Sequence, residues 1–235
     1  MLKSSLNKNK YGYLFVAPFI IGFLLFGLYP VLNTIGLSFT NTTMMTSHAK
    51  FIWFDNFKAL FADAMFLKAM SNTWLLWLLN FIPQLGIAML ISVWFTSTRL
   101  KIKAIGIWRV IFYLPNLIMP AVVAALFFSL FSYYGPVNQL LVRAGLLPEA
   151  IDFIRDRTVM RSLVVFIQWW LWYGQTIIIL MAAMTSISVS VYEAALVDGA
   201  NGWQMFRFIT LPLIKPVMIF ILVTSLVGGM QMFDI

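Results

Sequence analysis

Charged residues are scarce in this sequence of 235 residues: Lys, Arg, Asp and Glu together make up 10%, whereas 62% of the residues are apolar. A soluble globular domain usually carries about a quarter charged residues, so the composition excludes that class and indicates a chain surrounded by lipid. Cysteine is absent, which excludes a disulfide framework and thiolate ligation of a metal.

Several catalytic patterns are missing as well. No Gly-x-x-x-x-Gly-Lys-Ser/Thr phosphate loop occurs, so this chain cannot itself be an ATPase. The single histidine, His48, is expected to be a solvated loop residue rather than a metal ligand or a proton carrier. No nucleophile-elbow pattern accompanies it, which disfavours a Ser-His-Asp hydrolase. We therefore expect no enzyme activity, no metal site and no cofactor bound by this chain.

The few charged residues leave long windows that contain no Lys, Arg, Asp or Glu. About 20 apolar residues are enough for a helix to cross ~30 Å of hydrocarbon, so each window can hold one spanning helix. We predict an all-α membrane protein, a polytopic helical bundle in a single transmembrane domain over residues 1–235. The absence of charge from the windows disfavours a proton-coupled carrier, because proton relays need buried ionisable groups. The charge-free windows are residues 11–49, 69–98, 110–142, 162–192 and 216–233, and the spans predicted at them are about residues 13–38, 70–96, 109–131, 161–186 and 213–233.

The basic residues between the spans predict the orientation, because short basic loops stay on the cytoplasmic side. The N-terminus and the second connection carry basic residues without an acid, whereas the first and third connections mix both signs and are expected outside. This places the N-terminus and residues 188–215 in the cytoplasm and Asp234 at the outer edge. The net charge of +8 then reflects topology rather than nucleic-acid binding. The basic residues concerned are Lys3, Lys8 and Lys10, then Arg99, Lys101, Lys103 and Arg109.

Local signals in the connections predict three smaller features. Residues 55–61 are typical of a short amphipathic helix at the membrane interface. Residues 137–144 lie between Gly-Pro turn signals and are expected to form another short helix. Prolines at 115 and 120 predict a kink in the third span.

The connection at residues 188–212 carries the most specific pattern. It contains Glu193-Ala194-Ala195, three further residues and then Gly199. The run from Glu193 favours a helix with its acid near the start, where the helix dipole stabilises negative charge, and Gly199 interrupts that helix. The small alanines allow close approach to the groove of a partner. A catalytic pair of Glu193 and Asp198 is disfavoured, because nothing nearby would complete such a site.

In the second half of this connection, nine residues separate Gly199 from Ile209, and one residue separates Ile209 from Leu211-Pro212. Trp203, Phe206 and Ile209 are spaced three apart, which predicts a second amphipathic helix resting on the membrane domain. Pro212 is expected to end it.

This pattern resembles the EAA signature of the permease subunits of binding-protein-dependent ABC importers, and the run from Tyr192 to Pro212 is similar to their carbohydrate branch. The resemblance implies the maltose-permease-like, MetI-like fold of type I importers, with the 188–212 loop as the coupling element that sits on a nucleotide-binding subunit. Relatives continue into a sixth span, so the chain is similar to a permease truncated before its last helix. The coupling residues implied are Glu193, Ala194, Ala195, Asp198, Gly199, Ile209, Leu211 and Pro212.

The same resemblance implies the function and the partners. The expected function is translocation of a sugar or oligosaccharide delivered by an extracellular solute-binding protein, across a bacterial-type inner membrane. The expected partners are an ABC ATPase dimer, which uses ATP and Mg²⁺, a second permease subunit in a heterodimer, and membrane lipid, with no nucleic acid. The alternatives are a non-sugar solute such as a glycerol-phosphate-like polyol, or an ATP-independent carrier or channel.

Uncharged polar and aromatic residues inside the spans are candidates for contact with such a cargo, because sugars are recognised by amides and aromatic rings. Amides also hold membrane helices together, and Trp is common in interfacial belts, so a purely structural role is the alternative. In the fourth span, Gln168 precedes the main candidates and Trp169 lies on the neighbouring face. The candidates are Asn80, Gln84, Trp172, Tyr173, Gln175 and Gln231.

Overall fold

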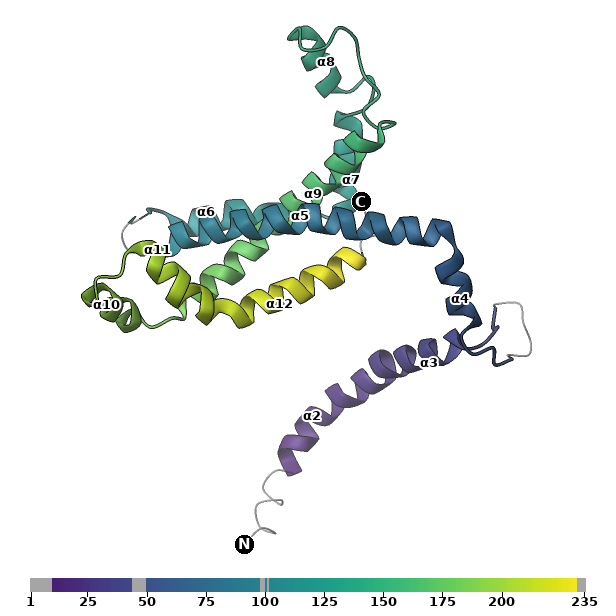
Figure 1. Cartoon of the computed structure of the whole chain (residues 1–235), viewed down its shortest axis with the longest axis horizontal. Helices are drawn as coiled ribbons and strands as arrows, with labels where there is room; N and C mark the ends of the chain where they lie inside the picture. Colours follow the sequence, from purple (N-terminus) through teal and green to yellow (C-terminus); the bar gives the residue numbers. More distant parts are fainter. Residues whose placement is uncertain (1–9, 44–49, 98–99, 101, 232–235) are drawn as a thin grey trace. The chain divides into compact units, whose positions relative to one another are not determined.

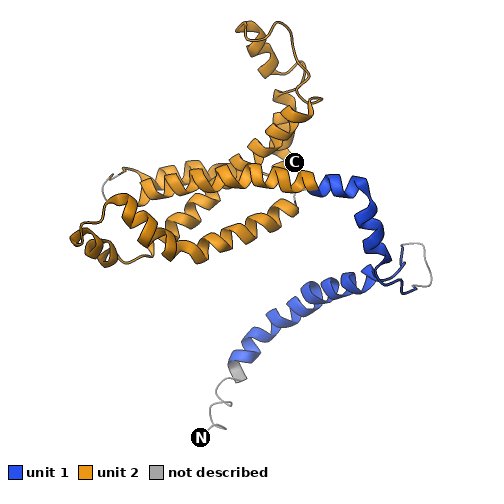
Figure 2. Cartoon of the chain, viewed as in Figure 1, with its two compact units in different colours: residues 1–70 blue, residues 71–235 orange. Residues whose placement is uncertain are grey.

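The computed structural model describes residues 10–43, 50–97, 100 and 102–231. Several residues that carry sequence predictions lie outside these ranges: Lys3, Lys8, His48, Arg99, Lys101 and Asp234. The chain divides into two compact units, residues 1–70 and 71–235 (Figure 2). The described part is helical, and its one pairing of extended residues is a single antiparallel bridge between Thr40 and Phe51.

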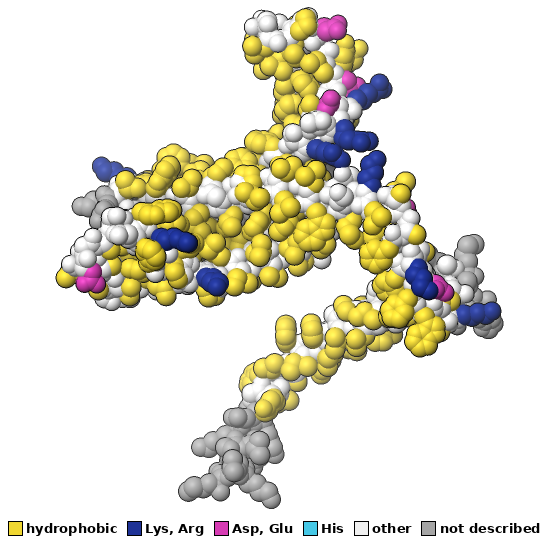
Figure 3. Space-filling view, viewed as in Figure 1, with side chains coloured by type: hydrophobic (Ala, Val, Ile, Leu, Met, Phe, Trp, Pro, Cys, Tyr) yellow, Lys and Arg dark blue, Asp and Glu magenta, His cyan; other side chains and the backbone are white. Residues whose placement is uncertain are grey.

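The first unit contains a long apolar helix built from α2 (Lys10–Phe23), a π-helical turn (Leu24–Leu28) and α3 (Tyr29–Ser38) (Figure 1). Pro30 has no N–H to donate, and the wider turn directly before it accommodates the missing hydrogen bond. Hydrophobic side chains cover the visible surface of this helix (Figure 3), and none of its most apolar stretch is buried within the protein. The predicted interfacial helix is confirmed as a helix by α4 (Asp55–Ala62).

The second unit is built around α5 (Ala64–Thr96), α9 (Arg157–Thr185) and α12 (Leu211–Met230) (Figure 1). Hydrogen bonds join α5 to α9: the Ser92 hydroxyl donates to the Ile177 carbonyl at 3.1 Å. Such interhelical bonds replace the hydrophobic driving force that lipid does not provide. The core side chains between these helices are Trp77, Phe81, Ala88, Ile177, Leu180, Met181, Met184, Ile214 and Ile221.

The third predicted span is sharply bent. Helix α6 (Ile105–Tyr113) runs into a 3₁₀ turn (Leu114–Leu117), and α7 (Pro120–Leu130) leaves it at 85°. Met119 is extended because a residue before proline is forced out of the helical region. The predicted kink is therefore confirmed. Beyond it, α8 (Pro136–Arg143) confirms the other predicted short helix.

Helix α9 approaches α6 backbone to backbone at Gly174. A Cβ added to Gly174 would clash with the carbonyl oxygen of Phe112, so only glycine fits this crossing. Close approach of helices at small residues is the usual way of packing in lipid.

By length and apolarity, four continuous helices of the described residues could cross a membrane, and the bent pair 105–130 would make a fifth. The last of them runs without interruption from Gly202 to Met230. The prediction that Pro212 ends a helix is therefore wrong. Pro212 stands in the first turn of α12, directly after a π-helical turn (Phe206–Thr210), where its missing N–H costs no regular hydrogen bond.

Candidate functional site

The 188–212 loop begins with α10 (Val189–Val197), the short helix that the sequence predicted. It starts earlier than expected, so Glu193 lies in the second turn and not near the start. The reason is that Ser188 is extended (ψ 133°) and marks the beginning of the helix, five residues before Glu193. The helix dipole therefore does not explain the acid at this position. Glu193 and Ala194 are exposed, and Ala195 is half-buried.

Gly199 ends α10 in a well-defined cap. Its φ of +77° lies in the left-handed region, which only glycine adopts at little cost. The Ala200 N–H donates to the Ala195 carbonyl at 2.9 Å, and the Gly199 N–H donates to the Leu196 carbonyl at 3.1 Å. These two bonds form a Schellman motif, which satisfies carbonyls that would otherwise be orphaned. Gly199 is therefore required by the backbone geometry of this turn.

The chain then enters α11 (Gly202–Met205) through a capping box. The Asn201 carboxamide oxygen accepts from the Gln204 N–H, and the Gln204 side chain accepts from the Asn201 N–H. The apolar face predicted for this stretch is only partly formed: Phe206 and Ile209 are half-buried, but Trp203 remains exposed. Leu211 and Pro212 belong to the first turn of α12, so the loop is continuous with the last apolar helix.

One further contact ties α10 to that helix. The hydroxyls of Tyr192 and Thr210 lie 2.8 Å apart, and Thr210 is buried. Thr210 also donates to the Met205 carbonyl at 3.4 Å, so the Tyr192 hydroxyl can donate to Thr210. Sequence reasoning missed this pair because its members are separated by 18 residues and carry no periodic signal. This contact therefore joins α10 to the residue directly before α12.

Helix α10 carries exposed apolar side chains beside the exposed Glu193. Val197 is 88% exposed, and Leu196 and Val189 are exposed as well. Apolar side chains at the end of a protruding helix are typical of a surface that a partner covers.

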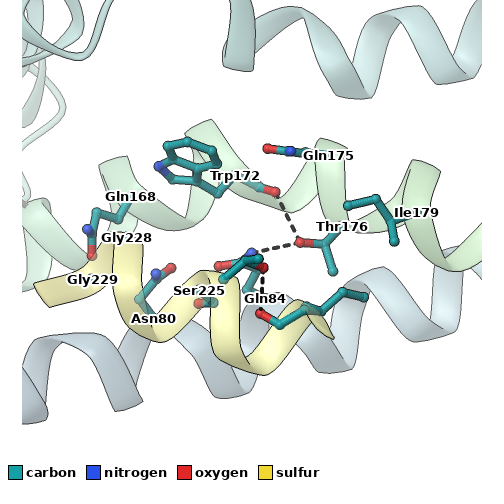
Figure 4. Close-up of a pocket in the computed structure, with 12 residues that line it drawn as sticks. Asn80, Gln84, Gln168, Trp172, Gln175, Thr176, Ile179, Ser225, Gly228 and Gly229 are labelled. Atoms are coloured by element: carbon teal, nitrogen blue, oxygen red, sulfur yellow. Dashed lines mark hydrogen bonds between the residues drawn. The ribbon is translucent and has the colours of Figure 1, made fainter. Parts of the chain in front are cut away.

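A cavity of about 130 Å³, lined by both polar and apolar groups, lies among α5, α9 and α12 in the second unit (Figure 4). Its lining combines four amides with small hydroxyl residues, two glycines and one large aromatic ring. The lining residues are Asn80, Gln84, Gln168, Trp172, Gln175, Thr176, Ile179, Ile221, Thr224, Ser225, Gly228 and Gly229.

Three amide oxygens of this cavity are buried without a hydrogen-bond partner: those of Asn80, Gln84 and Gln168. These side chains are only 4%, 4% and 5% exposed. Buried polar atoms are nearly always satisfied, so three unsatisfied amide oxygens in one cavity indicate a site that accepts hydrogen bonds from a ligand or water. The Gln84 amide is held in place because its nitrogen donates to the Thr176 hydroxyl at 2.7 Å.

The structure separates the predicted cargo candidates into two groups. Asn80, Gln84, Trp172 and Gln175 line the cavity together. Tyr173 does not line it: its ring stacks on Trp169, with centroids 5.0 Å apart, and meets Phe112 edge-on. Gln231 is exposed after the end of α12, outside the lining.

The contribution of α12 was not anticipated. Ser225 accepts a hydrogen bond from the Trp77 indole N–H at 3.2 Å, and Gly229 leaves the space that the Trp77 ring occupies, since a Cβ there would lie 2.5 Å from it. Thr224-Ser225 and Gly228-Gly229 are four residues apart, so they share one helix face. This four-residue spacing is the sequence signal that could have identified a cavity-lining face on α12.

Ionisable groups are absent from the cavity lining as it is described. No cluster of three or more His, Cys, Asp or Glu that could hold a metal occurs among the described residues. The cavity can exchange hydrogen bonds with a solute and stack on its Trp172 ring.

Known proteins resemble this chain along nearly its whole length. It is 34% identical to the lactose transport system permease protein LacF of Rhizobium radiobacter, over 99% of this chain and 77% of that protein. It is 29% identical to the arabinooligosaccharides transport system permease protein AraP of Bacillus subtilis (strain 168), over 97% of this chain and 71% of that protein.

A solved structure has the same fold. The crystal structure of a bacterial ABC transporter involved in the import of the acidic polysaccharide alginate contains a chain with a TM-score of 0.75 and 29% identity, covering 98% of this chain and 77% of that one. Residues 69–235 match the family described as binding-protein-dependent transport system inner membrane component. This chain belongs to that family and is a multi-pass membrane permease subunit of an ABC importer.

Proposed function

We propose that this chain conducts an uncharged sugar or oligosaccharide across the membrane, and that the cargo contacts the cavity among α5, α9 and α12. The observation that carries the proposal is the set of unsatisfied amide oxygens of Asn80, Gln84 and Gln168 in one cavity. Saccharide hydroxyls donate hydrogen bonds, so they would satisfy these oxygens. The sugar permeases among the relatives support the same class of cargo.

A sugar has polar hydroxyl groups and an apolar ring face, and the rest of the lining suits the apolar face. Trp172 offers an aromatic ring to the apolar face of a pyranose, and Ile179 and Ile221 supply apolar walls. Gly228, where a Cβ would meet no atom within 4 Å, lets a solute approach the backbone of α12. A chain of several sugars could pass along such a surface without being bound tightly at any point, since each contact is a weak neutral hydrogen bond.

The alternative cargo, a phosphorylated polyol, is disfavoured by the same lining. A phosphate in a partly buried site needs Lys, Arg or backbone N–H donors to offset its desolvation. The described lining contains neither Lys nor Arg, and its unsatisfied atoms are acceptors, which repel an anion. An ATP-independent carrier is disfavoured by membership of the importer family.

Energy would come from a separate ATPase dimer, which uses ATP and Mg²⁺ while this chain binds no cofactor. We infer that α10 docks on the ATPase with its exposed apolar tip around Val197. Closure of the ATPase would move α10, and the Tyr192–Thr210 contact would pass the movement to α12, which lines the cavity. The coupling residues Glu193, Ala194, Ala195, Asp198, Gly199, Ile209, Leu211 and Pro212 remain predictions.

The proposed topology has the N-terminus and the 188–212 loop in the cytoplasm, where an ATPase operates. A second permease subunit would complete the pore, and an extracellular solute-binding protein would deliver the cargo. A solved bacterial alginate ABC transporter in complex with an alginate pentasaccharide-bound periplasmic protein supports delivery by such a protein: its matching chain has a TM-score of 0.74 and 28% identity over 94% of this chain and 73% of that one.

The cargo assignment can be tested by measuring ATP-dependent uptake in proteoliposomes that hold the complete transporter. Gln168→Leu and Gln175→Ala remove amides from the cavity, and Tyr173→Phe is the matched control on the other face of α9. Loss of one neutral hydrogen bond costs about 0.5–1.5 kcal/mol, so the half-saturating cargo concentration should rise about 2- to 10-fold in each amide variant. Unchanged half-saturation in both variants, with normal assembly, would exclude cargo contact here.

A further inference from the structure

Five aromatic residues gather just beyond the end of the first long helix. We call Phe39, Phe51, Trp53, Phe54 and Phe57 the aromatic cluster. Phe39 is at its centre, with ring centroids 6.1 Å from Phe51, 5.4 Å from Phe54 and 5.6 Å from Phe57. Trp53 meets Phe51 edge-on at 4.9 Å. The cluster has no part in the cavity or in the 188–212 loop.

The backbone that carries the cluster is fixed by its own hydrogen bonds. The Asn56 amide donates to the carbonyls of Ser38 and Thr40, at 2.8 and 2.9 Å, and so joins α4 to the end of α3. The Ile52 N–H donates to the Phe39 carbonyl at 2.8 Å. The rings are therefore presented together as a preformed surface.

Much of that surface is uncovered within the protein. Phe51, Trp53 and Phe54 are between 56% and 66% exposed. A contiguous group of exposed aromatic rings is unusual in water and marks contact with a partner or a membrane. Trp53 also holds a left-handed backbone (φ 53°), a conformation that costs a bulky residue about 1–2 kcal/mol.

The length of the first helix gives the depth of the cluster. Its apolar stretch from Gly12 to Ser38 has 27 residues, which at 1.5 Å per residue span about 40 Å. The hydrocarbon core is ~30 Å thick and the bilayer with its headgroups ~40–45 Å, so the end at Ser38 lies in the headgroup layer. Phe39 follows directly. Trp is enriched at this level because its ring is apolar while its indole N–H meets water. Trp53 is a residue of this kind, and the phenylalanine rings beside it add apolar contact.

Basic residues flank the rings. Lys50 precedes Phe51, and the Lys58 ammonium is 3.1 Å from the exposed Asp55 carboxylate. Long basic side chains reach lipid phosphates while their stems lie along apolar surface. A headgroup layer can hold both the Lys50 cation and the Lys58–Asp55 ion pair beside the rings, which an apolar protein groove cannot do without a desolvation cost.

We propose that the aromatic cluster is a lipid-binding surface, inserted into the phospholipid headgroup layer at the end of the first span. Through Asn56 it anchors α4 and the end of α3 at one depth. Under the proposed topology this is the outer leaflet. The occupant is phospholipid, and neither the solute-binding protein nor the second permease is needed to cover the rings.

The absence of cysteine from the chain permits a direct test. Phe51→Cys and Phe54→Cys are each labelled with an environment-sensitive fluorophore in the complete transporter, reconstituted in vesicles of phosphatidylcholine and phosphatidylglycerol. Leu25→Cys, within the first span, is the deep reference, and the exposed Glu149→Cys in the loop after α8 is the aqueous reference. Two cluster positions are used so that loss of one ring does not decide the outcome.

We expect lipids that carry a nitroxide at the headgroup to quench both cluster probes strongly. Aqueous iodide should quench these two probes several-fold less than it quenches the probe at Glu149→Cys. This pattern should be the same without the solute-binding protein. Iodide quenching equal to that of Glu149→Cys would overturn the proposal. Shielding that appears only when the solute-binding protein is added would overturn it as well, because the surface would then be a protein docking site.

Discussion

Replacement of Gly199 gives the sharpest prediction for the 188–212 loop, because it changes the conformational preference of the backbone without adding a steric clash. A Cβ at this position meets no atom within 4 Å, so Gly199→Ala adds no clash. The cost is that of holding alanine at a φ of +77°, about 1–2 kcal/mol. Such a cost lowers the population of the native cap about 5- to 30-fold relative to its unfolded alternatives.

Two further replacements bracket the alanine variant. Asparagine visits the left-handed region more readily than alanine, so Gly199→Asn should retain more uptake. Proline fixes φ near −65° and removes the N–H that donates to the Leu196 carbonyl. Gly199→Pro cannot form the cap and should abolish uptake. Because Gly199 is exposed, membrane insertion should be normal in all three variants.

The assay is ATP-dependent uptake by the complete transporter in proteoliposomes, normalised to the amount of inserted permease. The expected order of uptake is wild type, Asn, Ala, Pro. Uptake at the wild-type rate in Gly199→Pro would refute the coupling role of this turn. If Asn proved as damaging as Pro, the left-handed geometry would not be the property that matters.

Three other substitutions test separate parts of the account. Glu193→Lys, on the exposed side of α10, should abolish uptake without impairing insertion, and wild-type uptake would contradict a docking role. Tyr192→Phe removes the hydroxyl that contacts Thr210, a loss of about 0.5–1.5 kcal/mol; less cargo should enter per ATP hydrolysed, and an unchanged ratio would exclude this route of coupling. Gly174→Ala should lower the yield of folded permease, because the new Cβ meets the Phe112 carbonyl, whereas Gly86→Ala, in open space, should not.

Features with local causes could be predicted from the sequence. Charge-free windows mark the apolar helices because the hydrocarbon core penalises a charged side chain near the middle of a span. The short helix at 55–62 was indicated by its amphipathic pattern, and the one at 136–143 by turn residues at its ends. The bend after Leu117 follows from prolines at 115 and 120. Gly199 was predicted to interrupt α10, and its positive φ explains why.

Features that depend on which helix faces pack against each other could not be predicted from the sequence. The sequence places Trp172 and Tyr173 on adjacent faces of α9, but only the positions of α5 and α12 decide that Trp172 lines the cavity and Tyr173 packs against Phe112. The continuity of α12 through Pro212 depends on a π-helical turn, for which no sequence pattern was available. The membrane orientation of the spans stays a prediction.

The central claim is that α10 is the docking element for the ATPase, and site-specific photo-crosslinking tests it most directly. A benzophenone amino acid is placed at Val197, which is 88% exposed at the end of α10, or at Tyr134 before α8 as the control. In the complete transporter, the account predicts an adduct with the ATPase from Val197 and none from Tyr134. An ATPase adduct from Tyr134 with none from Val197 would contradict both the docking role and the proposed orientation.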